Sequence, residues 1–129
     1  MTPIQLWLEA LEKPLFWSVR GRLRGHVKDS QITGCGFCIL GVLCELFIQH
    51  APEAKKIKAH WDGEVFVWTT DKEYRERQNI PTPVLAWWNR HHATIRWVHI
   101  IRFNDLHGDS FREMALYLRG LQQMEFVAR

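Results

Sequence analysis

The sequence lacks a long apolar run and a recognisable leader, and these absences limit where the protein works. No stretch of its 129 residues approaches the ~20 consecutive apolar residues of a membrane helix. The N-terminal segment, MTPIQLWLEALEKP, has no basic region followed by an apolar run, so no secretory signal peptide is expected. We therefore expect a cytoplasmic protein without a membrane partner.

Cysteine is scarce and charge is nearly balanced. Cys35, Cys38 and Cys44 are the only cysteines, and this odd number is expected to remain as free thiols in a reducing compartment. With 17 basic and 14 acidic residues the net charge is +3, too small to imply nucleic acid by itself. Repeats, low-complexity segments and linkers are also lacking. The length is that of one domain, residues 1–129, which needs no metal or cofactor to fold.

Aromatic residues, in contrast, are abundant. Seven Trp and seven Phe exceed what a small core usually needs, so some are expected to line a groove or an interface. The segment 13–28 is also distinctive, because it carries five basic residues and no acidic one: Lys13, Arg20, Arg22, Arg24 and Lys28. A local positive field favours an anionic partner, although a solvated basic loop is the simpler interpretation.

Periodicity and capping signals predict four helices, near residues 3–12, 38–50, 83–90 and 110–122. Thr2, Pro3 and Gln5 match a capping box with proline in the first turn. The segment 38–50 is too long for a strand, although Gly41 costs such a helix about 1 kcal/mol. Close packing of another element against Gly41 would explain this glycine.

Strands are predicted at two places. Asp62 and Gly63 are typical of a two-residue hairpin turn between residues 57–61 and 64–69. Residues 95–103 alternate between two faces, which predicts the clearest strand of the chain. Three further segments are predicted as irregular: 15–34 as a loop with at most a short strand, 71–79 as an exposed loop, and 104–109 as a turn. The fold class predicted is α+β, a small mainly antiparallel sheet with helices packed on one face.

Residues 34–46, with the sequence GCGFCILGVLCEL, resemble the Cys-Leu-Gly-Val-Leu-Cys core of a family of small proteins encoded by tailed phages and prophages. The Arg- and Gly-containing residues 20–24, the Pro, Val and Trp of residues 80–87, and NDLHGDSF at residues 104–111 match further family features in order. Ile39 replaces the usual Leu, and Asp109 separates Gly108 from Ser110. The resemblance implies a phage or prophage origin. It also implies an accessory role, including one that counters host defence, in which the protein binds a host protein. It implies no established reaction.

One hypothesis for chemistry is a cysteine nucleophile. A thiol at a helix N-terminus, as expected for Cys38, is favoured as thiolate by the helix dipole. His99 on a later strand would be the base, and Asn104 or Asp105 would orient it, which is the residue order of papain-like enzymes. The alternative is that Cys38 and Cys44 are small core residues, and the apolar residues after Cys38 favour burial. The chain is therefore expected to be a binding protein, with a cysteine-dependent hydrolase or transferase as the alternative.

Cys35 and Cys38 also have the spacing of a zinc or redox pair. His91, His92 or His107 would have to complete a zinc site, but His91 and His92 are adjacent and cannot easily reach one tetrahedral ion together. A redox role would require a surrounding βαβ pattern, which is absent. We expect no metal.

The remaining hypothesis is a binding site formed by arginine and tryptophan side chains. Arg20, Arg22 and Arg24 can bind anionic groups with bidentate geometry, and indoles stack on bases or fill protein pockets. Asn104 and Asp105, in the turn predicted after the strand, could also contact a ligand. The tryptophans expected to contribute are Trp17, Trp61, Trp87 and Trp88, whereas Trp7, Trp68 and Trp97 are expected in the core. A host protein, an anionic ligand, or a nucleotide or nucleic acid are the partners considered.

Overall fold

The computed structural model describes residues 1–13, 17–18, 22–29, 32–107 and 110–128, and for residues 17–18, 26–29, 32–35, 107 and 128 it describes the backbone alone. This part of the chain forms helices and strands in the order α1 (Pro3–Glu12), β1 (Trp17–Ser18), β2 (Arg24–Asp29), β3 (Ile32–Phe37), α2 (Ile39–His50), α3 (Glu53–Lys56), β4 (His60–Asp62), β5 (Val65–Thr69), β6 (Glu73–Glu76), α4 (Thr82–His91), α5 (Trp97–His107) and α6 (Phe111–Ala128). The α+β class is thereby confirmed.

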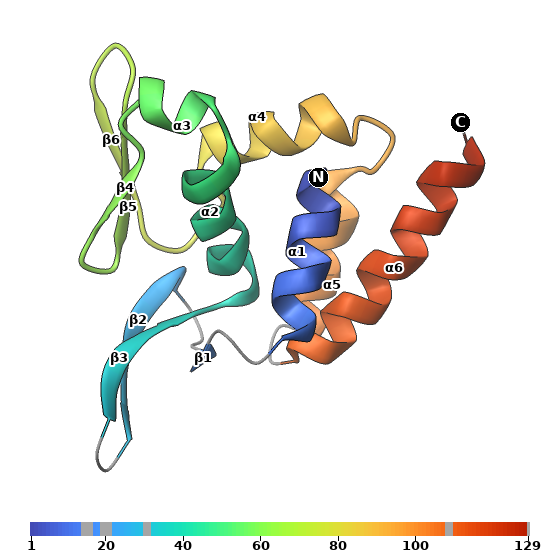
Figure 1. The fold of residues 1–129 in the computed structure, drawn as a ribbon, viewed down its shortest axis with the longest axis horizontal. Helices are drawn as coiled ribbons and strands as arrows, with labels where there is room; N and C mark the ends of the chain where they lie inside the picture. The colour runs from blue at the N-terminus through green and yellow to red at the C-terminus, as the bar shows by residue number, and fades with distance from the viewer. Residues whose placement is uncertain (14–16, 19–21, 30–31, 108–109, 129) are drawn as a thin grey trace.

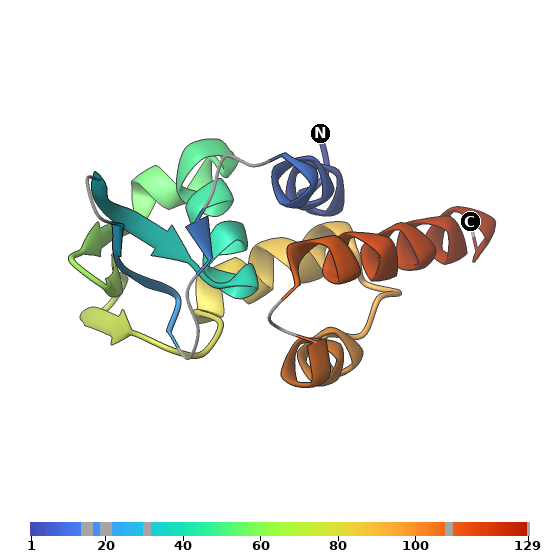
Figure 2. The same cartoon turned by 90° about the horizontal axis from the view of Figure 1, so that it is seen from below.

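The strands form two small sheets rather than one. The first has the order β1-β3-β2, with β2 antiparallel to β3 and the short β1 parallel to it. The second is an antiparallel β4-β5-β6 meander. Both sheets lie on one side of the molecule, and α1, α4, α5 and α6 lie on the other, with α2 between them (Figures 1 and 2).

The helix starts predicted from capping signals are confirmed. Thr2 accepts the amide of Gln5 while the Gln5 side chain accepts the Thr2 amide, so both halves of the capping box are present. Ser110 accepts the amide of Glu113 at the start of α6. The helices predicted at 38–50 and 83–90 correspond to α2 and α4. The helix predicted at 110–122 continues to Ala128.

The strand predicted at residues 95–103 is wrong, because Trp97–His107 is helix α5. The side chains that contact the core are Trp97, Ile100, Ile101 and Phe103, which share one side of a helix rather than alternate sides of a strand. Trp97 stacks on Trp7 at 6.1 Å between ring centroids. The free energy gained by burying this side of the helix is larger than the preference for a strand that the alternating pattern indicates. Asn104 and Asp105, predicted in a turn, therefore lie within a helix.

Two segments predicted as loops contain strands. Residues 15–34 include β1, β2 and the start of β3, and residues 71–79 include β6. The β2–β3 pairing sets Gly25 against Gly36, so main-chain hydrogen bonds form a hairpin that side-chain pattern does not indicate. A hairpin forms where it is predicted, but its two turn residues are Gly63 and Glu64, because Asp62 still pairs with Val65. Gly63 has a φ of 59°.

The core lies between the helices and the inner side of the strands. Its largest fully buried side chains include Trp7, Phe47, Phe66 and Trp88. Within the described ranges, no helix has the length and apolar character required to cross a membrane.

Candidate functional site

Leu23, just before β2, is fixed both to the residue after β6 and to the start of α2. The Leu23 amide donates to the Arg77 carbonyl after β6 at 2.7 Å, and the Leu23 carbonyl accepts the Cys38 amide at 3.2 Å. A Cβ on Gly41 would lie 1.8 Å from the same carbonyl oxygen, so only glycine allows α2 to approach β2 this closely. The packing role predicted for Gly41 is confirmed. The next residue, Arg24, is consequently placed where the two sheets meet.

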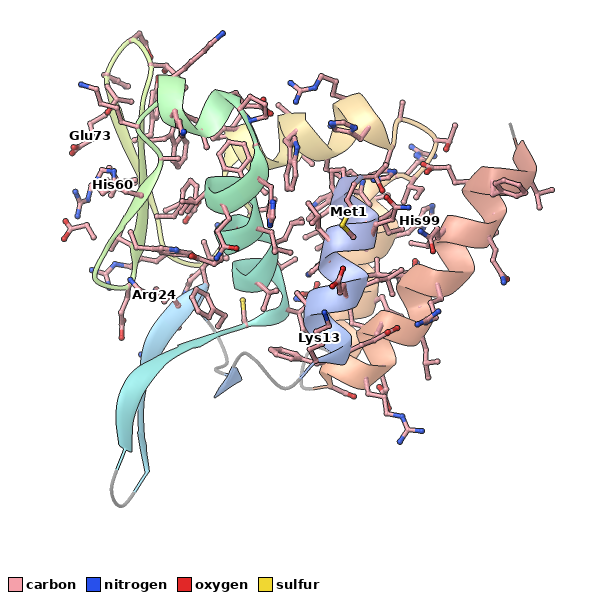
Figure 3. All side chains as sticks on the ribbon, in the orientation of Figure 1. Met1, Lys13, Arg24, His60, Glu73 and His99 are labelled. Atoms are coloured by element: carbon pink, nitrogen blue, oxygen red, sulfur yellow. The ribbon has the colours of Figure 1, made fainter. Side chains whose placement is uncertain are left out.

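Arg24 is the centre of the candidate site. Its guanidinium carbon lies 5.5 Å from the Trp61 ring centroid and 5.8 Å from that of Phe37, within the range of cation–π attraction. Nη1 donates to the Gly63 carbonyl at 2.9 Å, in the turn between β4 and β5. Figure 3 labels Arg24 at this junction. The aromatic rings and the carbonyl therefore hold the guanidinium in one position.

No described carboxylate forms a salt bridge with Arg24. Its Nε atom is buried and has no hydrogen-bond partner among the described residues. A guanidinium held on aromatic rings without a neutralising carboxylate is suited to accept an external anion.

The Trp61 indole is held in place by Glu45 and by two phenylalanine rings. The indole Nε1 donates to Glu45 Oε2 at 2.9 Å. The ring also contacts Phe37 and Phe66 edge-on, at 5.8 and 5.3 Å between centroids. Trp61 therefore acts as a fixed support that is only partly buried.

Arg22 adds a second guanidinium just before the start of β2. It is exposed and lies 3.7 Å from Glu64, too far for a strong hydrogen bond. A Cβ on Gly25 would lie 2.4 Å from Arg22 Nε, so the arginine crosses directly over this glycine. Arg20 is outside the described residues. Arg22 and Arg24 together form what we name the Arg24 site, with Phe37, Glu45, Trp61 and the Gly63 carbonyl as its support.

Cys38 is the N-cap of α2, as predicted. Its Sγ accepts the Gly41 amide at 3.3 Å, and burial raises the pKa of the thiol above its ordinary value, the hydrogen bonds from the backbone opposing this only in part. Burial likewise raises the pKa of the Cys44 thiol, and more strongly. Both cysteines are free. The neutral thiol is therefore favoured at Cys38, in contrast to what a nucleophile requires.

The structure does not bring the hypothetical partners of Cys38 to it. His99 is exposed on α5, where Figure 3 shows it close to α6. Asn104 and Asp105 belong to the same helix. The start of α2 lies apart from α5 in both views (Figures 1 and 2).

The predicted ligand-binding tryptophans have different positions. Trp87 and Trp88 are buried in the core, at 4% and 0% exposure, so neither can stack on a ligand without repacking. Trp88 packs against Trp7, Trp97 and His92. The side chain of Trp17 lies outside the description, which leaves Trp61 as the described candidate at the surface.

Some residues of this site can be predicted from the sequence and others cannot. Asp62 and Gly63 predict a turn at this place, but nothing local links that turn to Arg24. The buried His92 was considered only as a metal ligand. Its Nε2 accepts the Ile4 amide at 3.1 Å, and Nδ1 lies 3.0 Å from Glu125, which joins α1, α4 and α6. In the described part of the chain, no three His, Cys, Asp or Glu side chains are grouped as metal ligands.

Comparisons of the chain with models of protein families, with curated proteins and with solved structures found no match.

Proposed function

We propose that this chain is a non-enzymatic binding protein that recognises an acidic group of a protein partner at the Arg24 site. The observation that supports this most is the guanidinium of Arg24, which is held by two rings and the Gly63 carbonyl without a described carboxylate to neutralise it. Arginine and tryptophan are the residue types most enriched at the energetic centres of protein interfaces.

A protein partner accounts for more of the site than a free small anion does. The Arg24 site lies at the junction of two sheets, where Trp61 offers an apolar surface beside the cation. A partner carboxylate would pair with the guanidinium while neighbouring apolar side chains cover the indole. The resemblance to phage and prophage proteins adds a context, in which the partner is a protein in the cytoplasm of a bacterial host.

The cysteine-enzyme alternative has less support. A half-buried Cys38 with a raised pKa, and His99 on a distant helix, do not provide an activated nucleophile. A nucleic-acid partner would use the same Arg24 site, and nuclease treatment of the lysate distinguishes it from a protein partner.

The test is a pull-down from bacterial lysate with three baits: wild type, Arg24→Gln and Arg112→Gln. Arg112 is exposed at the start of α6, so its variant removes the same charge elsewhere. We expect at least one protein, identified by mass spectrometry, to be retained by wild type and Arg112→Gln and lost from Arg24→Gln. Nuclease treatment of the lysate must leave that protein bound. Recovery that requires intact nucleic acid, or that is equal for all baits, would contradict the proposal.

A further inference from the structure

The outward side of α6 carries an uncharged line of residues. Leu116, Gly120, Gln123 and Val127 follow one another at spacings of four, three and four, so they lie along one side of the helix. Leu116 is 61% exposed and Val127 82%. A Cβ on Gly120 would meet nothing within 4 Å. We call these four residues the outer line of α6.

Two large apolar side chains flank the outer line. Met124 is 69% and Phe126 is 78% exposed, one on each side. Hollows accompany both: Leu121 and Met124 line one together with the start of α5, and Gln122, Gln123, Phe126 and Val127 line the other. The surface thus has the ridges and grooves that helix packing uses.

The C-terminal half of α6 extends beyond the ends of α1 and α5 (Figures 1 and 2). The fully buried residues of the helix, Met114, Ala115 and Leu118, all belong to its N-terminal half. Leu121 and Glu125 attach the inner side of this C-terminal half to the fold. Its outer side is apolar and exposed, which favours a packing partner.

We propose that a second copy of this chain is that partner, with the two α6 helices packed antiparallel along their outer lines. A two-fold axis between Leu121 and Gln122 sets Leu116 against the partner's Val127. It also sets Gly120 against the partner's Gln123, where the missing side chain allows close approach. Each projecting half then packs on the supported half of the other helix.

Self-complementarity and charge favour a second copy over an unrelated protein. An isologous contact needs one patch that fits itself, and the outer line does so in this register. Between Met114 and Val127 the charged residues of α6 are Arg119 and Glu125. Arg119 pairs with Glu12 and Glu125 with His92 of the same chain, so no like charges oppose each other. Antiparallel helices also align their dipoles favourably.

The available area sets the strength of the dimer. A contact made by part of one helix from each copy is small, at or below the area of about 1,000 Å² that a stable specific interface buries. We therefore expect a dimer that dissociates on dilution, with a Kd in the micromolar range.

The first measurement is sedimentation of the full chain over a range of concentrations. Wild type should change from monomer to dimer, and Val127→Asp should weaken the association at least tenfold. Leu106→Asp is the matched control, because Leu106 is 72% exposed on α5 outside the outer line. Circular dichroism verifies that both variants fold. A monomer at every concentration, or equal weakening by both variants, would overturn the proposal.

The second measurement tests the register by disulfide formation. Leu116 and Val127 are about 16 Å apart along one helix, too far to bridge within a chain. The double variant Leu116→Cys, Val127→Cys should therefore give a covalent dimer under mild oxidation, and wild type and both single variants should not. Covalent dimers from either single variant would indicate a parallel or different contact and overturn the arrangement.

Discussion

Gly41 of α2 rests against the carbonyl oxygen of Leu23, at a point where a Cβ would lie 1.8 Å from that oxygen. The same carbonyl accepts the Cys38 amide at the start of the helix. One glycine thus determines how closely α2 approaches β2. It also determines where Arg24, the residue after Leu23, meets Phe37 and Trp61.

Replacement of Gly41 by alanine should destabilise the protein. Alanine favours helix by about 1 kcal/mol over glycine, but overpacking against backbone costs about 1–3 kcal/mol or more, and a backbone carbonyl cannot turn away as a side chain does. We expect a net loss in the free energy of unfolding, measured by urea denaturation. Gly120→Ala is the control, measured at a concentration where the chain is monomeric, since a Cβ on this helical glycine meets nothing of its own chain within 4 Å. A Gly41→Ala protein as stable as Gly120→Ala would refute the close contact.

The reactivity of the Cys38 thiol with an alkylating reagent should rise only at alkaline pH. Because burial raises the pKa of its thiol, Cys38 should react with iodoacetamide more slowly in the folded protein at pH 7.5 than in urea-unfolded protein. Its rate should increase about tenfold per pH unit until the folded-state pKa is reached. Peptide mapping after brief labelling measures this. His99→Ala should leave the rate unchanged, and faster labelling of folded than of unfolded protein would restore the nucleophile hypothesis.

The same raised pKa values make stability depend on alkaline pH. The contribution of the Cys38 and Cys44 thiols is complete below the pKa of an unfolded cysteine, about 8.5, because both states are then protonated. As the pH rises above that value the unfolded chain releases its protons first, so the contribution is lost as the pH approaches the folded-state pKa. Urea denaturation at pH 7.5 and pH 10 should show a lower free energy of unfolding at pH 10. A Cys44→Ala variant should show a smaller difference between the two pH values, and an undiminished difference would contradict this assignment.

His92 should be necessary for stability in a way that its neighbour is not. The ring is 1% exposed. Since Nε2 accepts the Ile4 amide, Nδ1 carries the proton and donates to Glu125. His92→Phe removes both hydrogen bonds at a buried position, and we expect a loss of about 2–4 kcal/mol in the free energy of unfolding. His91→Phe, at an exposed position, should change it by less than about 0.5 kcal/mol. Similar losses for the two variants would show that the buried hydrogen bonds contribute little.

The elements that the sequence predicts correctly are those determined by local chemistry. The capping box at Thr2 and the hairpin around Gly63 depend on residues within a few positions of one another, so a short stretch identifies them, the hairpin to within one residue. The glycine at position 41 predicts that another element packs closely against this helix. Its partner, the Leu23 carbonyl, could not be named, because that contact depends on the tertiary fold.

The incorrect predictions concern segments that long-range packing determines. Residues 95–103 fit both a strand and a helix, and the position of Trp97 against Trp7 and Trp88 decides for the helix. Strand β6 has the sequence EYRE, which is mostly charged and shows no apolar pattern. It nevertheless pairs with β5 at the edge of the second sheet. The Arg24 site was predicted only in part. The sequence predicts Arg22, Arg24 and Trp61, but Phe37, Glu45 and the Gly63 carbonyl come together only in the fold.

The most direct test of the account is the affinity between this chain and the protein that the pull-down recovers. Isothermal titration should compare wild type, Arg24→Lys, Arg24→Gln and Arg112→Gln at low and high salt. Loss of a charge-assisted hydrogen bond costs about 1.5–3 kcal/mol, so Arg24→Gln should bind about 10- to 150-fold more weakly. Arg24→Lys should be intermediate, because it keeps the charge and loses the planar fork. Arg112→Gln should bind like wild type. Equal affinity for all four proteins, or failure to recover any partner, would contradict the account.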